Sequence, residues 1–215
     1  MNVDRFTQTL PAQYENWGTP DVRPLSEVYI DKVWAMSAPV THTLLNHATR
    51  FLESGEVYLE VGVLQGAAFT AALMHNKVLG IAVDNFSMLP STEGNKKAFL
   101  RRIEELEMVE RTTLYEQDFV EFFLNPPDVK VGVYFCDGPH GYKGTWDGLE
   151  LSIPVLADSA LIVMDDYNWD DVRKATLDWM ESRKNNVTML FDLQTPLDSK
   201  LWWNGLAVIS WKRNA

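Results

Sequence analysis

The sequence predicts an α/β protein with a doubly wound, seven-stranded and mostly parallel sheet that has helices on both faces. Short apolar runs rich in β-branched residues alternate with segments of helical periodicity, as in successive βα units. Two of these runs contain almost no polar residue, which is typical of strands buried on both faces. The last two runs have no helix-length segment between them, so we expect a C-terminal antiparallel strand pair at the edge of the sheet.

The predicted elements follow one another in a regular order. Apolar residues recur at helical spacing over residues 40–52, and Gly55 is placed to end that helix. Strands are predicted at residues 57–61, 78–83, 112–115, 131–136, 160–164, 187–193 and 206–211. Helices are predicted at residues 67–75, 96–109, 119–124 and 146–156 and around residues 172–179. Pro154 should bend the fourth of these helices or end it early.

The length of 215 residues fits one domain spanning residues 1–215. Within it, residues 1–54 are expected to form an N-terminal arm or lid with helices, because prolines interrupt the first 38 residues and give them little regular pattern. Residues 55–215 carry the alternating strands and helices and therefore form the α/β core.

Composition excludes several classes of partner. The net charge of −11 argues against nucleic acid and against an anionic membrane surface, because both require a basic face. No apolar run approaches the roughly 20 residues needed to span a bilayer, and the first residues do not resemble a signal segment. The single cysteine, Cys136, lies inside an apolar strand as a core residue, and a cytoplasmic location is expected. Formation of a homo-oligomer stays open.

A glycine loop follows the first predicted strand, with Gly62 and Gly66 four positions apart after Glu60. It lacks the dinucleotide G-x-G-x-x-G spacing because position 64 is Leu, and no Gly-Lys-Ser/Thr follows as in a phosphate loop. A turn with little side chain lets a ligand approach the backbone closely. The loop therefore indicates a ligand without a pyrophosphate, or, alternatively, an ordinary strand-to-helix turn.

Acidic and amide residues after the next two strands complete a candidate nucleoside site. Asp84 ends the second strand about 20 residues after the loop, where an acid commonly accepts hydrogen bonds from ribose hydroxyls. Gln117 and Asp118 follow the third strand and would lie over the base. Asp118 is equally well placed to be the N-cap of the helix that it precedes.

Three aspartates and a histidine follow the fourth and fifth strands. Asp137 and His140 come after residues 131–136, and Asp165 and Asp166 come after residues 160–164. The carboxyl ends of neighbouring parallel strands open into one crevice, where unpaired carboxylates would repel one another. A divalent cation such as Mg²⁺ or Mn²⁺ removes that repulsion. Alternatively, the aspartate pair caps the following helix or binds nearby basic side chains.

His140 is the candidate general base in this crevice. A hydroxyl is a poor nucleophile near neutral pH, and both a bound cation and a base help to remove its proton. Imidazole has the unperturbed pKa best suited to this task. Three further aromatic positions near turns, Trp169, Trp202 and Trp203, either line the pocket or pack in the core.

The order of elements with Glu60-x-Gly62-x-x-x-Gly66, Asp84 and Asp118 resembles the class I S-adenosylmethionine-dependent methyltransferases, which have a Rossmann-like fold. The resemblance covers about residues 55–213. It implies that the glycine loop approaches the methionine part of S-adenosylmethionine, that Asp84 binds the ribose and that Gln117 and Asp118 bind the adenine. Glu60 and Asp137 are also expected to belong to this cofactor site.

The later motifs sharpen the resemblance. Asp137-Gly-x-His140-x-Tyr142 and Asp165-Asp166-Tyr167 are similar to motifs of the metal-dependent macrocin O-methyltransferases, which act on macrolide sugars. The resemblance implies that Asp137, Asp165 and Asp166 hold Mg²⁺ and that His140 is the base. Pro139 and Gly141 differ from the more usual acidic and Ser or Thr residues of that group. Tyr142 and Tyr167 are expected either to support the site by hydrogen bonds or to pack.

These inferences predict a Mg²⁺-dependent O-methyltransferase that acts on a hydroxylated small molecule, for example a sugar or a glycoside. Two alternatives stay open. One is a protein that binds S-adenosylmethionine or S-adenosylhomocysteine without turnover. The other is a hydroxylase-like enzyme that uses the same acidic metal site, although such an iron site normally has more histidine ligands than one.

Overall fold

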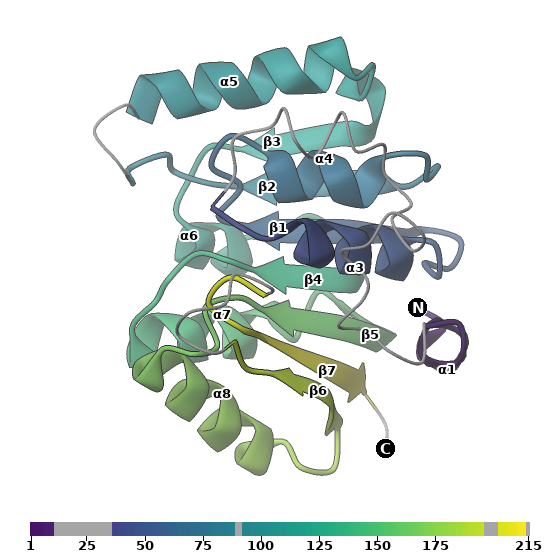
Figure 1. The fold of residues 1–215 in the computed structure, drawn as a ribbon, viewed down its shortest axis with the longest axis vertical. Coiled ribbons are helices and arrows are strands. Elements are labelled where there is room, and N and C mark those ends of the chain that lie inside the picture. Colours follow the sequence, from purple (N-terminus) through teal and green to yellow (C-terminus); the bar gives the residue numbers. More distant parts are fainter. Residues whose placement is uncertain (11–35, 89–91, 196–201, 214–215) are drawn as a thin grey trace.

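Seven strands form one sheet in the order β3-β2-β1-β4-β5-β7-β6 (Figure 1). The computed structural model describes residues 1–10, 36–88, 92–195 and 202–213. The strands in chain order are β1 (Glu56–Val61), β2 (Leu79–Val83), β3 (Thr112–Tyr115), β4 (Lys130–Cys136), β5 (Leu156–Met164), β6 (Val187–Leu193) and β7 (Leu206–Lys212). All seven strands predicted from the sequence are therefore present, each within a few residues of its expected bounds.

The sheet is parallel except at β7. Strands β1 to β5 pair in parallel, and β7 is antiparallel to both of its neighbours, β5 and β6. In Figure 1 the arrowheads of β1, β2 and β4 point to the same side of the molecule, whereas that of β7 points to the other. The predicted C-terminal antiparallel pair is thus confirmed, with β6 at the edge and β7 between β5 and β6.

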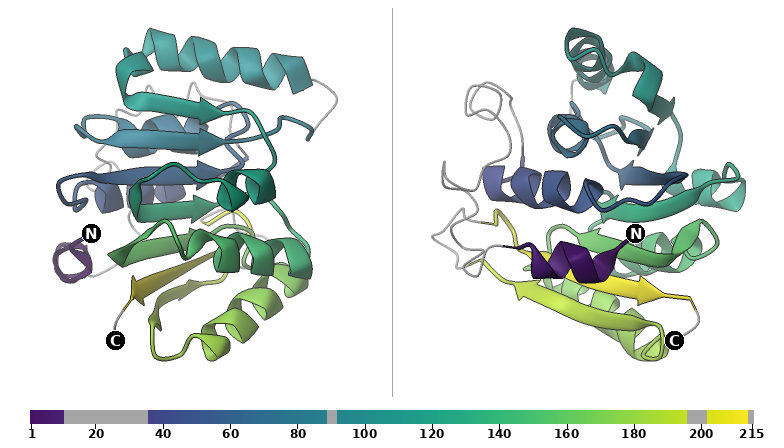
Figure 2. Two further views of the ribbon diagram at one scale, coloured as in Figure 1. Left: turned by 180° about the vertical axis from the view of Figure 1, so that it is seen from behind. Right: turned by 90° about the vertical axis from the view of Figure 1, so that its right-hand side faces the viewer.

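Helices cover both faces of the sheet (Figure 2). On one face, a single apolar cluster includes residues from α1 (Val3–Gln8), α3 (Pro39–Thr49), α4 (Ala67–Leu73) and α5 (Thr92–Glu105). On the other face, the cluster includes residues from α6 (Phe119–Leu124), α7 (Tyr142–Ser152) and α8 (Asp170–Ser182). A short 3₁₀ turn, η2 (Val109–Arg111), precedes β3. The doubly wound prediction is confirmed, and none of the described helices has the length and apolarity needed to cross a bilayer.

Burial on both faces explains why the central strands are continuous apolar runs. In β4, every residue after Lys130 is buried, and consecutive side chains enter opposite clusters. Cys136 is a buried free thiol, and burial raises its pKa to about 11. The interpretation of Cys136 as a core residue is confirmed.

The bounds of three predicted helices differ from those in the structure. The first helix, α3, ends at Thr49, well before Gly55, because Phe51 and Leu52 pack against the core from the turn that follows. Helix α5 begins and ends four residues earlier than predicted. Its first turn is polar and contains Gly94, which has a low helix propensity, so the sequence does not mark where the helix begins. Helix α7 begins at Tyr142, four residues earlier than predicted, and ends at Ser152; it therefore ends early, ahead of Pro154, as the sequence predicted.

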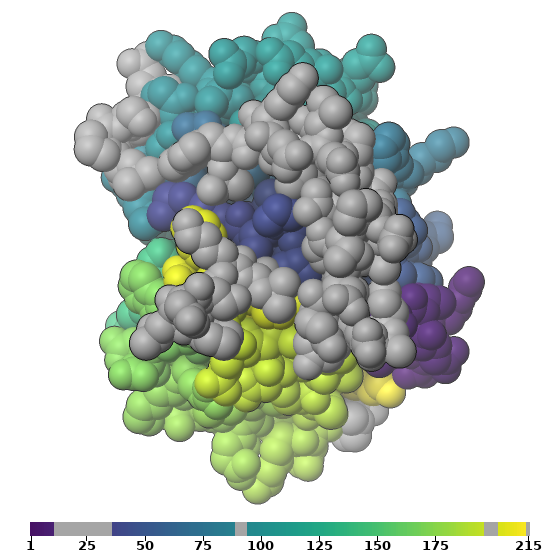
Figure 3. Space-filling view, viewed as in Figure 1, coloured from purple at the N-terminus to yellow at the C-terminus, as the bar shows by residue number. Residues whose placement is uncertain are grey.

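Helix α1, the first element of the expected N-terminal arm, packs against the core. Phe6 of α1 is fully buried, and its ring lies 6.4 Å from that of Phe51. Helix α1 lies at the end of the sheet opposite the carboxyl ends of the parallel strands (Figure 1). In the space-filling view its purple atoms form surface at that end (Figure 3). The rest of the arm, residues 11–35, lies outside the described residues.

Gly62 allows the loops after β1 and β4 to touch. Its φ is +87°, and a Cβ built on it would lie 2.1 Å from the Asp137 carbonyl oxygen. Gly55 has a similar φ of +82°, but a Cβ there would meet nothing within 4 Å. A side chain added at Gly55 therefore loses free energy of folding only through the backbone conformation. A side chain added at Gly62 loses it through the backbone conformation and also through the contact with Asp137.

We expect Gly55→Ala to lower the free energy of unfolding by about 1 kcal/mol, because only the left-handed conformation opposes the new side chain. Gly62→Ala should lower it by about 3 kcal/mol or more, since a main-chain carbonyl must also move. Urea unfolding followed by far-UV circular dichroism measures both values. Equal losses for the two variants would show that the contact at Gly62 is unimportant.

Candidate active site

A cleft of about 340 Å³ opens at the carboxyl ends of the parallel strands. Its walls come from the loops after β1, β2, β3, β4 and β5, from the connection between β6 and β7, and from Met36 in the expected N-terminal arm. Ligands of open α/β sheets bind in this position. Residues predicted for the cofactor and residues predicted for the cation line the same cleft, namely Gly62, Asp84, Gln117, Asp118, Asp137, His140 and Asp166.

The glycine loop contributes backbone to the cleft. The Gly62 N–H donates to the Val83 carbonyl at 2.9 Å, so the loop stays close to the end of β2. Gly66 does not line the cleft; it begins α4 with a φ of +80°, and a Cβ there would strike the Phe99 ring. Glu60 also lies outside the lining. Of the three residues predicted in this motif, only Gly62 therefore lines the cleft.

Asp84 joins the loops after β1 and β2. Its carboxylate accepts the Leu64 N–H at 2.8 Å and the Phe86 N–H at 2.6 Å. Burial raises the pKa of Asp84, and these hydrogen bonds oppose the rise. Each carboxylate oxygen can still accept a second hydrogen bond. Asp84 thus shapes the cleft and remains available to ligand hydroxyls.

Asp118 has the N-cap role that was considered for it and also lies at the cleft. It is the N-cap of α6 and accepts the Val120 N–H through Oδ1 at 2.8 Å. It also lines the cleft next to Gln117. The second carboxylate oxygen is not used by the cap and can accept a hydrogen bond from a ligand.

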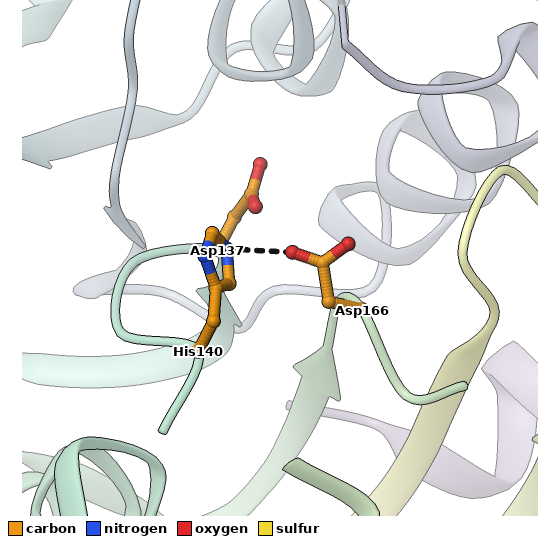
Figure 4. Close-up of side chains that lie close together, drawn as sticks. All are labelled: Asp137, His140 and Asp166. Atoms are coloured by element: carbon orange, nitrogen blue, oxygen red, sulfur yellow. Dashed lines mark ion pairs between the residues drawn. The ribbon is translucent and has the colours of Figure 1, made fainter. Parts of the chain in front are cut away.

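Asp137, His140 and Asp166 form an acidic group at the ends of β4 and β5 (Figure 4). One ligand atom from each residue lies within 4.8 Å of the others. His140 Nε2 lies 2.6 Å from Asp166 Oδ2. This ion pair is not an aligned hydrogen bond, and Nε2 has no other hydrogen-bond partner among the described residues.

Asp165 is not brought into this group, although it precedes Asp166. Both residues follow β5, which ends at Met164, and Asp166 has a left-handed backbone with a φ of +54°, so the two carboxylates do not face the same point. Asp165 is buried, and its Oδ1 accepts the Asp166 N–H at 2.9 Å. Neither aspartate caps α8, whose N-cap is Trp169. Arg173 and Lys174 pair instead with Asp192 and Asp178.

The concentration of carboxyl groups makes ionisation unfavourable in the absence of a cation. Although Asp137 partly faces the cleft, burial by the surrounding protein raises its pKa well above the usual range, and Asp165 and Asp166 add to the rise. Burial likewise raises the pKa of Asp165, and the charge of Asp166 adds to it. The pairing with Asp166 raises the pKa of His140, against the effect of burial.

Aromatic side chains form the wall beside the acidic group. Trp169 and Trp203 line the cleft, whereas Trp202 is buried in the core. The Trp169 ring lies 4.9 Å from the His140 ring and is 47% exposed. An exposed indole beside a histidine offers an apolar face to a ligand.

The two tyrosines of the later motifs lie outside the cleft lining. Tyr142 donates to Asp178 Oδ2 at 2.9 Å and stacks on Trp146. Tyr167 is fully buried, with Arg173 over its ring. Both therefore serve packing in this region rather than ligand contact.

Asn204 was not predicted from the sequence. It lines the cleft, and its Nδ2 donates to Asp166 Oδ1 at 2.6 Å. It lies 38 residues after Asp166 in the connection between β6 and β7. No motif marks this position, so only the fold shows that it belongs to the site.

Comparison with known proteins identifies the family. Residues 59–167 match a family described as methyltransferase domain, and this region contains β1 to β5 and most of the cleft. The chain belongs to the methyltransferase-domain family. No curated protein sequence matches the chain.

Solved structures with a similar fold include several methyltransferases. TomG, an O-methyltransferase from Streptomyces achromogenes solved with SAM, is 14% identical with a TM-score of 0.64, and the match covers 99% of each chain. PaMTH1 from Podospora anserina, solved with SAH, is 13% identical with a TM-score of 0.59, covering 98% of this chain and 93% of that one. Precorrin-6y C5,15-methyltransferase from Geobacter metallireducens is 17% identical with a TM-score of 0.57, covering 90% and 96%. At these identities the likeness establishes the fold.

Glu60 is a buried carboxyl group that lies outside the cleft lining. Its Oε2 accepts the Tyr58 hydroxyl at 2.5 Å, and its side chain is almost completely buried. Burial raises the pKa of Glu60 to about 8, with Asp84 and Asp165 adding to the rise. Because the folded state binds this proton more tightly than the unfolded state, the associated stability is lost as the pH rises through the folded pKa.

We expect Glu60→Gln to remove this pH dependence, since the amide keeps the shape without an ionisable proton. Between about pH 5 and pH 8, the wild-type free energy of unfolding should fall relative to that of the variant by about 1 kcal/mol per pH unit. Urea unfolding of the metal-free proteins at several pH values measures the difference. Parallel pH profiles for the two proteins would contradict the raised pKa.

Proposed function

We propose that this chain transfers the methyl group of S-adenosylmethionine to a hydroxyl of a small molecule, with a divalent cation in the acidic group. The observation that carries the proposal is that one cleft contains both residues predicted to bind the nucleoside, such as Asp84, and the Asp137–His140–Asp166 group. Family membership supports methyl transfer. The oxygen acceptor and the cation are inferred from the side chains in the cleft.

The loops after β1, β2 and β3 would bind the methyl donor. Gly62 presents backbone without a side chain, so the donor can approach the end of β1 closely. Asp84 would accept the ribose hydroxyls while it keeps its two backbone hydrogen bonds. Gln117 and the free oxygen of Asp118 would contact the adenine. Glu60 and Gly66 would support this loop without lining the cleft, because Glu60 accepts the Tyr58 hydroxyl and Gly66 is the N-cap of α4.

The acidic group fits a hard divalent cation. Two carboxylates and an imidazole nitrogen, which is paired with Asp166, converge within 4.8 Å, and carboxylate oxygens suit Mg²⁺ or Mn²⁺. We assign the cation to Asp137 and Asp166. Asp165 would hold the Asp166 backbone in place by accepting the Asp166 N–H. When bound, the cation would lower the pKa of the acceptor hydroxyl and stabilise the resulting negative charge.

His140 would accept the proton that the hydroxyl loses. As the new carbon–oxygen bond forms and the carbon–sulfur bond breaks, the proton passes to the imidazole. Asp166 lies against Nε2 and Trp169 packs on the ring, so both hold the base in position. Because the base must start unprotonated, its raised pKa implies that activity increases as the pH rises through that pKa.

The acceptor would lie against the aromatic wall. Trp169 and Trp203 provide apolar faces next to His140, and such faces pack against the flat side of a sugar or of another ring. A sugar or glycoside acceptor, as expected from the sequence, is compatible with these contacts.

The affinity for S-adenosylmethionine tests the part of the cleft that would bind the methyl donor. Asp84→Ala should weaken binding by about tenfold or more, because ribose hydroxyls lose a charged acceptor and two loop N–H groups lose their partner. Asp128→Ala, which removes an exposed carboxylate between α6 and β4, is the matched control and should bind normally. Isothermal titration calorimetry measures both affinities, and equal affinities for the two variants would remove Asp84 from the nucleoside site.

Methyl transfer tests the second half. With methyl-labelled donor and a panel of hydroxylated acceptors, treatment with EDTA should abolish transfer and Mg²⁺ should restore it. His140→Gln should lower kcat by about a hundredfold while S-adenosylmethionine still binds, and His75→Gln, at an exposed position, should have no effect.

Two results would contradict this assignment. Full activity after exhaustive chelation would exclude the cation. If His140→Gln weakens Mn²⁺ binding as strongly as Asp166→Ala does, His140 is a ligand of the cation rather than the base.

A further inference from the structure

Asp166 lies in a loop whose backbone requires support from elsewhere. Its φ is +54°, a left-handed conformation that is unfavourable for a residue with a side chain. The Asp166 N–H is bonded to Asp165, and the Asp166 carbonyl accepts the Trp169 N–H at 2.9 Å. These bonds hold the turn, but they do not set the direction of the Asp166 carboxylate.

The described residues at the two ends of the connection between β6 and β7 are bonded to this loop. The Tyr167 N–H donates to the Gly205 carbonyl at 3.1 Å, and the Asn168 N–H donates to the Asn204 carbonyl at 2.7 Å. The Asn168 side chain also bonds both backbone groups of Thr195, at 2.5 and 3.1 Å. Gly205 makes room for this arrangement, because a Cβ there would lie 2.2 Å from Asn168 Oδ1.

Asn204 reaches from this connection to the carboxylate itself. Its Nδ2 lies 2.6 Å from Asp166 Oδ1, and Asp166 Oδ2 lies 2.6 Å from His140 Nε2. The two oxygens of Asp166 therefore have different partners on opposite sides. Within the described residues, no other uncharged side chain donates to this carboxylate.

We propose that Asn204 is a positioning residue that holds the Asp166 carboxylate toward His140 and Asp137. A carboxylate with one oxygen tied to an amide cannot rotate freely, so its other oxygen stays at the acidic group. The inference rests on the proposed function for its catalytic consequence, but not for the placement of Asp166. It assigns a role in the site to the segment that follows residues 196–201, where the sequence shows no motif.

Asn204→Asp is the sharpest test, because it keeps the size of the side chain, removes the donor and places a second negative charge beside Asp166. Asn204→Ala removes the donor without adding charge. The matched control is Asn186→Ala. The Asn186 amide donates to the Lys212 and Arg213 carbonyls, at the end of β7 that is far from Asn204. The backbone bond from Asn168 to the Asn204 carbonyl is retained in every variant.

For both Asn204 variants we expect kcat to fall about tenfold or more and the affinity for Mn²⁺ alone, measured by electron paramagnetic resonance, to fall by a similar factor. The KM for S-adenosylmethionine should stay within about twofold of the wild type, because the donor half of the cleft is not altered. Asn186→Ala should change none of these values. Wild-type kcat and Mn²⁺ affinity in Asn204→Asp would overturn the proposal and leave Asn204 as a packing residue.

Crystal structures of the variants separate this proposal from the proposed function. In Asn204→Asp the Asp166 carboxylate should turn away from His140, whereas in Asn186→Ala it should not move. An unmoved carboxylate in Asn204→Asp overturns the positioning role, whatever the activity. If the wild type transfers no methyl group to any acceptor, the proposed function fails, and the crystal structures still decide the role of Asn204. Should Asn204→Asp not fold, Asn204→Ala gives the same comparison.

Discussion

The crowding of carboxyl groups at one end of the sheet is the constraint on which the rest of the site depends. Burial raises the pKa of Asp137 first, and Asp165, Asp166, Glu60 and Asp84 all add to the rise. Such a cluster keeps its charges only if protons or a cation neutralise part of them. Glu60 accepts a proton and lies outside the cleft lining, whereas Asp137 and Asp166 face the cleft. The positions of the side chains thus divide the acids into those that line the cleft and are available to a cation and those that do not line it.

The parallel sheet produces this crowding and also limits it. Neighbouring strands end at the same edge, so residues that follow β1, β2, β4 and β5 meet in a small volume. Gly62 lets the loops after β1 and β4 come into contact at the backbone, which brings the donor and acceptor halves of the cleft together. The left-handed backbone of Asp166 after β5 places its carboxylate in the cleft lining, whereas the Asp165 carboxylate accepts the Asp166 N–H.

Most of the fold and part of the site could be predicted from the sequence. Strands β4 and β5 were predictable because burial on both faces leaves a continuous apolar run, and Asp84 and Asp137 because they end such runs. The different roles of Asp165 and Asp166 were not predictable, since they depend on a left-handed residue without a glycine signal. Glu60 and Gly66 match the glycine-loop motif, but they do not line the cleft. Asn204 lies in a loop far from Asp166 in the sequence and approaches it only in the folded sheet.

The position of β7 has a consequence for how the protein assembles. Because β7 lies between β5 and β6, β6 cannot join the sheet until residues 206–212 have docked beside β5. The glycine loop and Asp84 depend on β1, β2 and β3, which pair through successive local crossovers. Asn204 precedes β7 directly and reaches Asp166 only when that strand is in place. The acidic half of the cleft is therefore completed by contacts that are more distant in sequence, and such contacts form late in folding.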